Sequence, residues 1–206
     1  MVALIFTFLS LLGSSSFLWA ADEPRRLVAV VDYIAGDYRN AVGAGKVTNP
    51  DEYREMTEFS ARALELAGQL RAAEKTDRTG VEASLNELAA QIKRKGDDKI
   101  VSELARRIKD KLLVAYNIAP YPRGFPALQA GRILYTENCA ACHGESGRGD
   151  GPSRETMKPK APPPANFTDT EIMASSSPFK VFNIVSFGIE GTAMANFSAL
   201  SDEERW

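Results

Sequence analysis

The chain has 206 residues, of which 44% are hydrophobic and 25% are charged, and its formal net charge at pH 7 is −2. This composition is typical of globular domains and excludes a disordered chain or a small disulfide-rich scaffold. The near-neutral charge gives no reason to expect a nucleic-acid partner, which needs a concentrated basic surface. With two cysteines and one histidine, any site built from several histidines is also excluded.

Residues 1–20 have the pattern of a secretory signal peptide. They carry no charge and form an apolar stretch that ends in small residues at Ala20 and Ala21. An uncleaved membrane anchor is the alternative, because twenty mostly apolar residues are just long enough to span a bilayer. In both interpretations the rest of the chain is exported.

Residues 27–117 are predicted to form an antiparallel bundle of four amphipathic helices, because apolar side chains recur there at helical spacing without strand-like alternation. Asn49 and Pro50 are a typical start for the second helix, and Gly96 is predicted to be the left-handed residue that ends the third. The four apolar stretches are 27–42, 53–70, 81–92 and 100–115.

The acidic residues of the first two helices have two interpretations. Carboxylate oxygens could recruit ferrous or ferric iron, but a solvated helix face is the simpler interpretation and the one we favour. These residues are Asp32, Asp37, Glu52, Glu55 and Glu58.

Residues 118–126 contain three prolines and a glycine, which neither continue a helix nor form a central strand. We therefore expect a Pro-rich linker there, followed by a second domain over residues 127–206. The stretch from Gly144 to Pro178 is rich in Gly, Pro, Ser and Thr, so this domain needs something other than a helix bundle to hold it together.

The second domain contains the pattern of covalent haem attachment, C-x-x-C-H, at Cys139, Cys142 and His143. Two cysteines three apart on a helix share one face, so both can form thioethers with haem vinyl groups, while the adjacent histidine turns towards the iron. A thioredoxin-like redox pair would require strand–helix–strand units that are not predicted here. A zinc site would need a fourth ligand from an acid.

An electron carrier of this kind is expected to have a methionine as the sixth iron ligand, because thioether sulfur favours ferrous iron. Met56 belongs to the bundle, which leaves Met157, Met173 and Met194. We favour Met194, because its small-residue surroundings would allow a loop to place the sulfur on the distal side of the haem. The alternative for any methionine is packing in a core.

Residues 127–206 resemble class I cytochrome c, in which a helix bearing a glycine and an aromatic residue, here Gly131 and Tyr135, leads into the attachment motif and a later methionine loop. The resemblance implies one haem c, and it makes the stretch from Pro162 to Phe167 part of the loop around the haem edge. It also implies a C-terminal helix that crosses the first one. Ser201 and Glu204 form a capping box that starts such a helix, so we expect this domain to be incomplete at its C-terminal end.

The bundle sequence, from Asp32 to Phe59, resembles the extracytoplasmic region that precedes the membrane domain of bacterial cytochrome c-fused iron permeases. That resemblance implies a membrane permease domain downstream of Trp206, a periplasmic or extracytoplasmic location with membrane attachment through that domain, and iron as a possible partner.

The predicted protein is therefore all-α, with an N-terminal antiparallel bundle and a small cytochrome c-like haem domain. We expect it to relay single electrons as part of an iron-uptake permease, and to be an electron carrier rather than an enzyme by itself. A free-standing periplasmic cytochrome, or the electron-accepting subunit of a periplasmic dehydrogenase, is the alternative. A second alternative is a haem sensor whose iron has an open sixth coordination position. A third is that the bundle serves only as a spacer.

Overall fold

The computed structural model describes residues 23–74, 79–157, 162–174, 176–189 and 191–206. The predicted signal peptide, residues 1–20, lies outside the described residues. Among the residues that the structure describes, we find no helix long and apolar enough to cross a bilayer.

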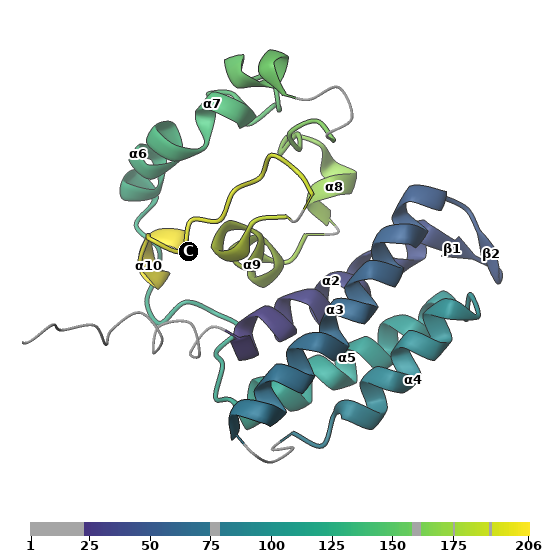
Figure 1. Ribbon diagram of the computed structural model, residues 1–206. Helices are drawn as coiled ribbons and strands as arrows, with labels where there is room; N and C mark the ends of the chain where they lie inside the picture. The colour runs from purple at the N-terminus through teal and green to yellow at the C-terminus, as the bar shows by residue number, and fades with distance from the viewer. Residues whose placement is uncertain (1–22, 75–78, 158–161, 175, 190) are drawn as a thin grey trace, which may run out of the picture.

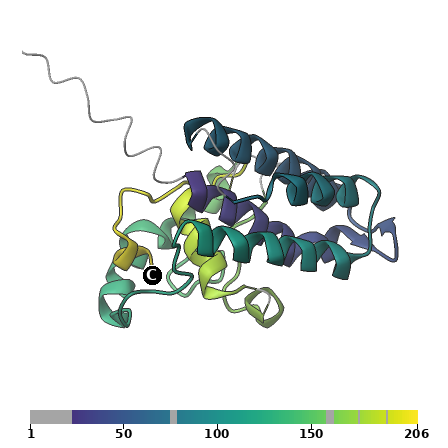
Figure 2. The same cartoon turned by 90° about the horizontal axis from the view of Figure 1, so that it is seen from below.

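The first half of the chain is a four-helix bundle, as predicted. Helices α2 (Glu23–Ala41), α3 (Pro50–Glu74), α4 (Glu82–Lys93) and α5 (Asp98–Ala115) follow one another through short connections. Helix α2 packs against α3 and α5, and α4 packs against the same two helices from the other side (Figures 1 and 2). Each helix therefore buries its apolar stripe against two neighbours, which is why the pattern of apolar residues alone predicts the bundle.

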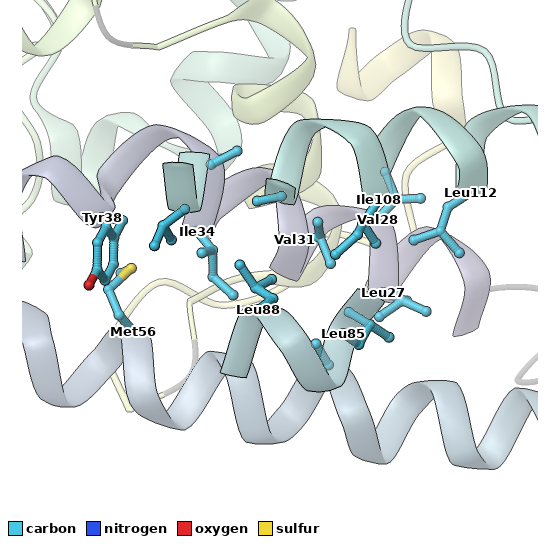
Figure 3. Packing of buried hydrophobic residues seen from close by; sticks show 14 of the residues in the cluster. Leu27, Val28, Val31, Ile34, Tyr38, Met56, Leu85, Leu88, Ile108 and Leu112 are labelled. Carbon is cyan, nitrogen blue, oxygen red and sulfur yellow. The ribbon is translucent and has the colours of Figure 1, made fainter. Parts of the chain in front are cut away.

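The core of the bundle lies along the inner faces of the four helices. Tyr38 and Met56 are fully buried at one end, where the Tyr38 hydroxyl donates a hydrogen bond to the Gly96 carbonyl oxygen at 3.1 Å. The Tyr53 hydroxyl lies 3.2 Å from the Ile92 carbonyl oxygen, so two tyrosines satisfy carbonyl groups at the end of α4. Figure 3 shows the apolar side chains that fill the remaining core, among them Leu27, Val28, Val31, Ile34, Leu85, Leu88, Ile108 and Leu112.

Side chains and backbone satisfy the helix ends largely as expected. The Asn49 side chain accepts hydrogen bonds from the Asp51 and Glu52 amides and caps α3, as predicted. The prediction for the end of α4 was off by one residue, because the left-handed conformation falls on Lys95, with φ 57°, and not on Gly96. Space is tight at Gly96, where a Cβ atom would lie 3.1 Å from the Gln91 carbonyl oxygen and would displace the end of the Gln91 side chain.

A short β-hairpin, which the sequence did not predict, connects α2 to α3. Strands β1 (Val42–Gly43) and β2 (Lys46–Val47) pair in antiparallel fashion, with Val42 opposite Val47. The two residues between them, Ala44 and Gly45, both have positive φ, as a tight two-residue hairpin turn requires.

The second half is held together by loops and short helices. After an extended stretch without helix or strand at residues 118–126, the chain forms α6 (Leu128–Asn138), α7 (Ala140–His143) and the 3₁₀ turn η1 (Pro152–Thr156). Helices α8 (Thr170–Ala174), α9 (Pro178–Phe187) and the one-turn α10 (Asp202–Arg205) follow. The predicted capping box is present at α10, where the Ser201 and Glu204 side chains bond to each other's backbone amides.

The two halves share part of one core. Helix α9 lies on α2 (Figure 1), and Phe179 and Phe182 of α9 are buried in the same apolar cluster as the bundle residues. Trp206 stacks on Phe182 at a centroid distance of 4.5 Å, and Arg25 of α2 pairs with Asp202 of α10 at 3.0 Å. The second half is therefore docked on the bundle rather than tethered only by the linker.

The packing of α5 and α9 on α2 corrects the prediction for the polar face of this helix. Asp32 and Asp37 do not lie on a solvated face: their side chains are only 10% and 9% exposed. Asp32 pairs with Lys109 of α5 at 2.7 Å, and Asp37 pairs with Lys180 of α9 at 2.6 Å. Both carboxylates are buried because α5 and α9 cover this side of α2.

Candidate metal centre

The two cysteines lie on one helical turn. Cys139 ends α6 and starts α7, with a bend between the two helices, and its carbonyl oxygen accepts hydrogen bonds from the amides of Cys142, at 3.1 Å, and His143, at 2.9 Å. Both thiols are free and partly buried. The turn therefore keeps both sulfurs and the imidazole on one short, hydrogen-bonded segment, as the spacing of the motif predicts.

The His143 ring is fixed from outside its own helix. Its Nδ1 atom lies 3.2 Å from the Ala165 carbonyl oxygen, and the ring stacks on Phe167 at a centroid distance of 4.5 Å and an interplanar angle of 19°. A carbonyl oxygen can only accept, so this hydrogen bond places the proton on Nδ1 and leaves the lone pair on Nε2. This is the tautomer and the orientation that a metal ligand needs.

The loop after His143 wraps around the cysteine turn through backbone contacts. The Gly149 amide donates to the His143 carbonyl oxygen at 2.8 Å, and the Phe167 amide donates to the Gly147 carbonyl oxygen at 2.7 Å. The Tyr135 hydroxyl donates to the Gly144 carbonyl oxygen at 2.7 Å and ties α6 to the same loop. These bonds bring the stretch that contains Phe167 back to the imidazole.

Two glycines allow this close approach. A Cβ atom on Gly149 would collide with the Pro164 carbonyl oxygen, and one on Gly151 would collide with the backbone of α7. Gly149 also has a φ of 72°, a conformation that disfavours other residues, whereas the restriction at Gly151 is one of space alone. The sequence motif identified the cysteines and the histidine, but not the Ala165 and Phe167 contacts, which the chain makes from more than twenty residues away.

The electrostatics of the cysteine pair do not fit a thioredoxin-like redox site. Burial, and secondly the charge of Cys142, raise the pKa of the Cys139 thiol above its ordinary value. Reactive cysteines of redox enzymes show the opposite shift, because their mechanism depends on the thiolate. In the described parts of the chain, no three His, Cys, Asp or Glu side chains are grouped to hold a metal ion, so nothing there supports the zinc alternative.

Comparison with protein-family models distinguishes between haem attachment, a redox pair and a zinc site. Residues 21–119 match the model of the iron permease-associated 4-helix bundle domain, and residues 128–206 match the model of cytochrome c. The chain joins an iron permease-associated bundle domain to a cytochrome c domain. No curated protein and no solved structure matches the chain. A cytochrome c domain implies a covalently bound haem c.

The cytochrome c domain has the surfaces that a large apolar cofactor requires. Between residues 127 and 206, the buried apolar side chains among those described are Ala140, Phe179 and Phe182, and the two phenylalanines belong to the core shared with the bundle. No side chain of α6 is buried. Several large apolar side chains are instead exposed, at Leu128, Ile133, Phe167, Ile172, Met173 and Val181. The haem-binding domain therefore has too little apolar core of its own, and a porphyrin would supply what is missing.

The candidate sixth ligands lie in three different settings. Met56 is fully buried in the bundle core, as expected. Met157 follows η1 and is half-buried, and Met173 lies on the exposed side of α8. Met194 is half-buried in the segment after α9, where its amide donates to the Thr192 hydroxyl at 3.1 Å. The choice among them stays a prediction.

The acids of the bundle fit iron recruitment poorly. Asp32 and Asp37 already hold lysines, and burial is the main cause that raises the pKa values of Glu52 and Glu55. Glu58 is exposed on α3. The carboxylates of Asp32 and Asp37, which are already paired with lysines, are therefore poor ligands for a cation.

Proposed function

We propose that this protein is an exported, single-haem electron carrier that works beside an iron permease. The observation that carries the proposal is the His143 geometry: Nδ1 donates to the Ala165 carbonyl oxygen, Nε2 is free, and two free thiols lie on the same turn. The match of residues 128–206 to cytochrome c supports it independently.

The residues divide the work of holding one haem. Cys139 and Cys142 would hold it through two thioether bonds, and His143 would bind the iron through Nε2. Met194 would supply the sixth iron ligand, and its sulfur would raise the reduction potential. A bound haem c supplies a one-electron couple, and the protein sets the potential, the exposure and the docking of this couple.

Two contacts from outside its own helix fix the orientation of the His143 ring. The Ala165 carbonyl oxygen keeps the proton on Nδ1, which leaves the Nε2 lone pair for a metal and holds the ring plane. Phe167 covers one face of the ring, so rotation of the imidazole would break both the stacking and the hydrogen bond. The site is therefore preorganised, which lowers the reorganisation that electron transfer requires.

The bundle supports the association with iron uptake. Its match to the iron permease-associated domain supports a haem domain that works next to a membrane permease for iron, and we propose that the bundle and the haem domain both lie on the extracytoplasmic side. There the cytochrome would accept or donate single electrons as the iron changes between its ferrous and ferric states. The protein acts as the carrier, and the direction of flow is set by its redox partner.

The test is a set of spectra on the full chain, exported from a bacterium that attaches haem c. We expect a haemochrome spectrum of the two-thioether type and, in the ferric protein, the weak long-wavelength band of a thioether–iron bond. Met194→Ala should abolish that band, whereas Met173→Ala and Met157→Ala should retain it. A haemochrome spectrum of free haem would contradict the attachment, and an unchanged band in Met194→Ala would contradict the sixth ligand.

The association with iron uptake has its own test. Cells that depend on this system should lose iron uptake with His143→Ala, because the haem then lacks its histidine ligand and no longer transfers electrons to or from the transported iron. Cells that carry Met173→Ala should still take up iron. Unchanged uptake in the His143→Ala cells would refute a role of the haem in iron transport.

A further inference from the structure

One lysine of the cytochrome c domain reaches into the bundle. Lys180 lies on α9, and its Nζ atom is 2.6 Å from Asp37 Oδ2 on α2 and 4.8 Å from the centre of the Tyr33 ring. The side chains of Lys180 and Asp37 are 12% and 9% exposed. The two residues are 143 positions apart in the sequence, so this buried contact joins the two domains.

The surroundings of Lys180 keep it in this place. The positive charge of Lys180 also acts on Glu52 of α3, where it partly offsets the rise in pKa that burial causes. Gly36 of α2 lies directly beside the ammonium group. A buried ion pair contributes little net stability, but removing one partner leaves an uncompensated charge and is strongly unfavourable. Such a pair has one well-defined arrangement, and it therefore fixes the position of α9 on α2.

The far end of α9 is joined rigidly to Met194. Gly188 ends the helix with a φ of 73°, and a Cβ atom there would collide with the Met194 carbonyl oxygen. The Ile189 amide donates to the same carbonyl oxygen at 3.1 Å, and the Phe197 amide donates to the Val185 carbonyl oxygen at 2.9 Å. The segment that carries Met194 is thus hydrogen-bonded at Met194 and at Phe197 to the chain at the C-terminal end of α9.

His143 depends on other supports. Its helix, α7, packs on α6 and η1, whereas α9 packs on α2 and α10 (Figure 1). The two proposed iron ligands therefore come from segments that are joined through α10, which contacts both α6 and α9, and the placement of α9 on the bundle is a second constraint on the position of the Met194 segment. An open pocket of about 130 Å³ extends along α9 from Lys180 to Ile189, so this side of the helix is not fully packed.

We propose that Lys180 is a positioning residue for the iron: its pair with Asp37 holds α9, and through α9 it holds the Met194 segment in the position from which Met194 would bind the iron. This inference rests on the proposed function, because it presupposes that Met194 binds the iron. It assigns to the bundle a direct part in setting the properties of the haem.

The test uses Lys180→Gln in the haem-containing full chain, with Lys109→Gln as the matched control. Lys109 forms the same kind of buried pair, with Asp32, but entirely within the bundle. We expect Lys180→Gln to weaken the thioether–iron band of the ferric protein by about twofold or more and to lower the reduction potential, because part of the population loses the sixth ligand. Lys109→Gln should keep the full band even where it destabilises the bundle to a similar degree.

Two further variants complete the test. Lys180→Arg keeps the charge and should restore most of the band, which a general loss of stability would not explain. Asp37→Asn breaks the same pair from the bundle side and decides the question if Lys180→Gln does not fold, because a weakened band supports the proposal and a full band refutes it. A wild-type protein without the band would refute the ligation by Met194 itself, whereas a wild-type band that persists in Lys180→Gln would refute only the role of Lys180.

Discussion

Gly151→Ala tests how the loop after His143 packs on the cysteine turn. Gly151 has φ −63° and ψ 151°, which any residue can adopt, so the added methyl group acts through its volume alone. The new Cβ atom would lie 2.5 Å from the Ala141 carbonyl oxygen, 2.6 Å from the Cys142 carbonyl carbon and 2.7 Å from the Ala140 carbonyl oxygen. All three atoms are backbone, so no side chain can rotate away to relieve the contact.

The structure gives the size of the effect. To reach an ordinary contact distance of 3.4 Å, the loop must move away from α7 by about 0.9 Å, which breaks the hydrogen bond from the Gly151 amide to the Cys142 carbonyl oxygen. Overpacking of this kind costs about 1 to 3 kcal/mol. In a domain of this size, a loss of about 2 kcal/mol lowers the melting temperature by roughly 10 °C.

The assay is thermal unfolding of the haem-containing protein, followed by the haem absorbance. Gly124→Ala is the matched control, because a Cβ atom on Gly124 has nothing within 4 Å and its backbone is not left-handed. We expect Gly151→Ala to unfold well below wild type and Gly124→Ala to unfold with it. Equal melting temperatures for the two variants would refute the packing of this loop on α7.

Three further predictions concern other parts of the molecule. Leu88→Ala should lower the free energy of unfolding by about 2 to 5 kcal/mol in a denaturant titration, since Leu88 is 1% exposed in the bundle core, and a change under 1 kcal/mol would contradict that burial. Gly131→Ala should stabilise α6 by about 0.5 to 1 kcal/mol, because nothing lies within 4 Å of the added methyl group; destabilisation would show that another segment packs there. Burial, and then the charges of Glu52 and Asp37, raise the pKa of Glu55. A raised folded-state pKa gives stability that is present at low pH and lost as pH rises, so Glu55→Gln should melt higher than wild type at pH 7 and equally at pH 4, and the reverse order at pH 7 would contradict this.

The bundle was predictable because its signal is local. Each of its helices carries its own apolar stripe, and Asn49 and Pro50 mark the start of α3. Both features can be recognised from a short stretch of sequence without knowledge of the rest of the fold. The hairpin at Val42–Gly43 was missed because two-residue strands are too short to show alternation. The left-handed position at Lys95 was missed because the next residue is a glycine, the residue type that most readily adopts this conformation, and the prediction was therefore made for Gly96.

The docking of the two domains was not predictable in the same way. Asp32 and Asp37 fall on the polar side of α2, where Lys109 of α5 pairs with Asp32 inside the bundle and Lys180 of the second domain pairs with Asp37. Their burial depends on Lys109 and Lys180, which approach from positions more than 70 residues away. The spacing of apolar residues within α2 gives no indication that a second domain covers this helix.

The candidate site shows the same division. The motif at Cys139, Cys142 and His143 is a local signal, and its geometry on one turn follows from helix spacing. The partners of the imidazole, Ala165 and Phe167, act through a backbone carbonyl group and a ring stack. A carbonyl group carries no sequence signature, so this support could be found only in the fold, although the resemblance to cytochrome c had placed this stretch at the haem edge.

The most direct test of the central claim is the intact mass of the exported full chain after treatment with an alkylating reagent. If the haem is attached as we propose, the mass exceeds that of the polypeptide by one haem, and neither Cys139 nor Cys142 takes up the reagent. Recovery of the bare polypeptide mass with two alkylated cysteines, from cells that attach haem to another c-type cytochrome, would contradict the account.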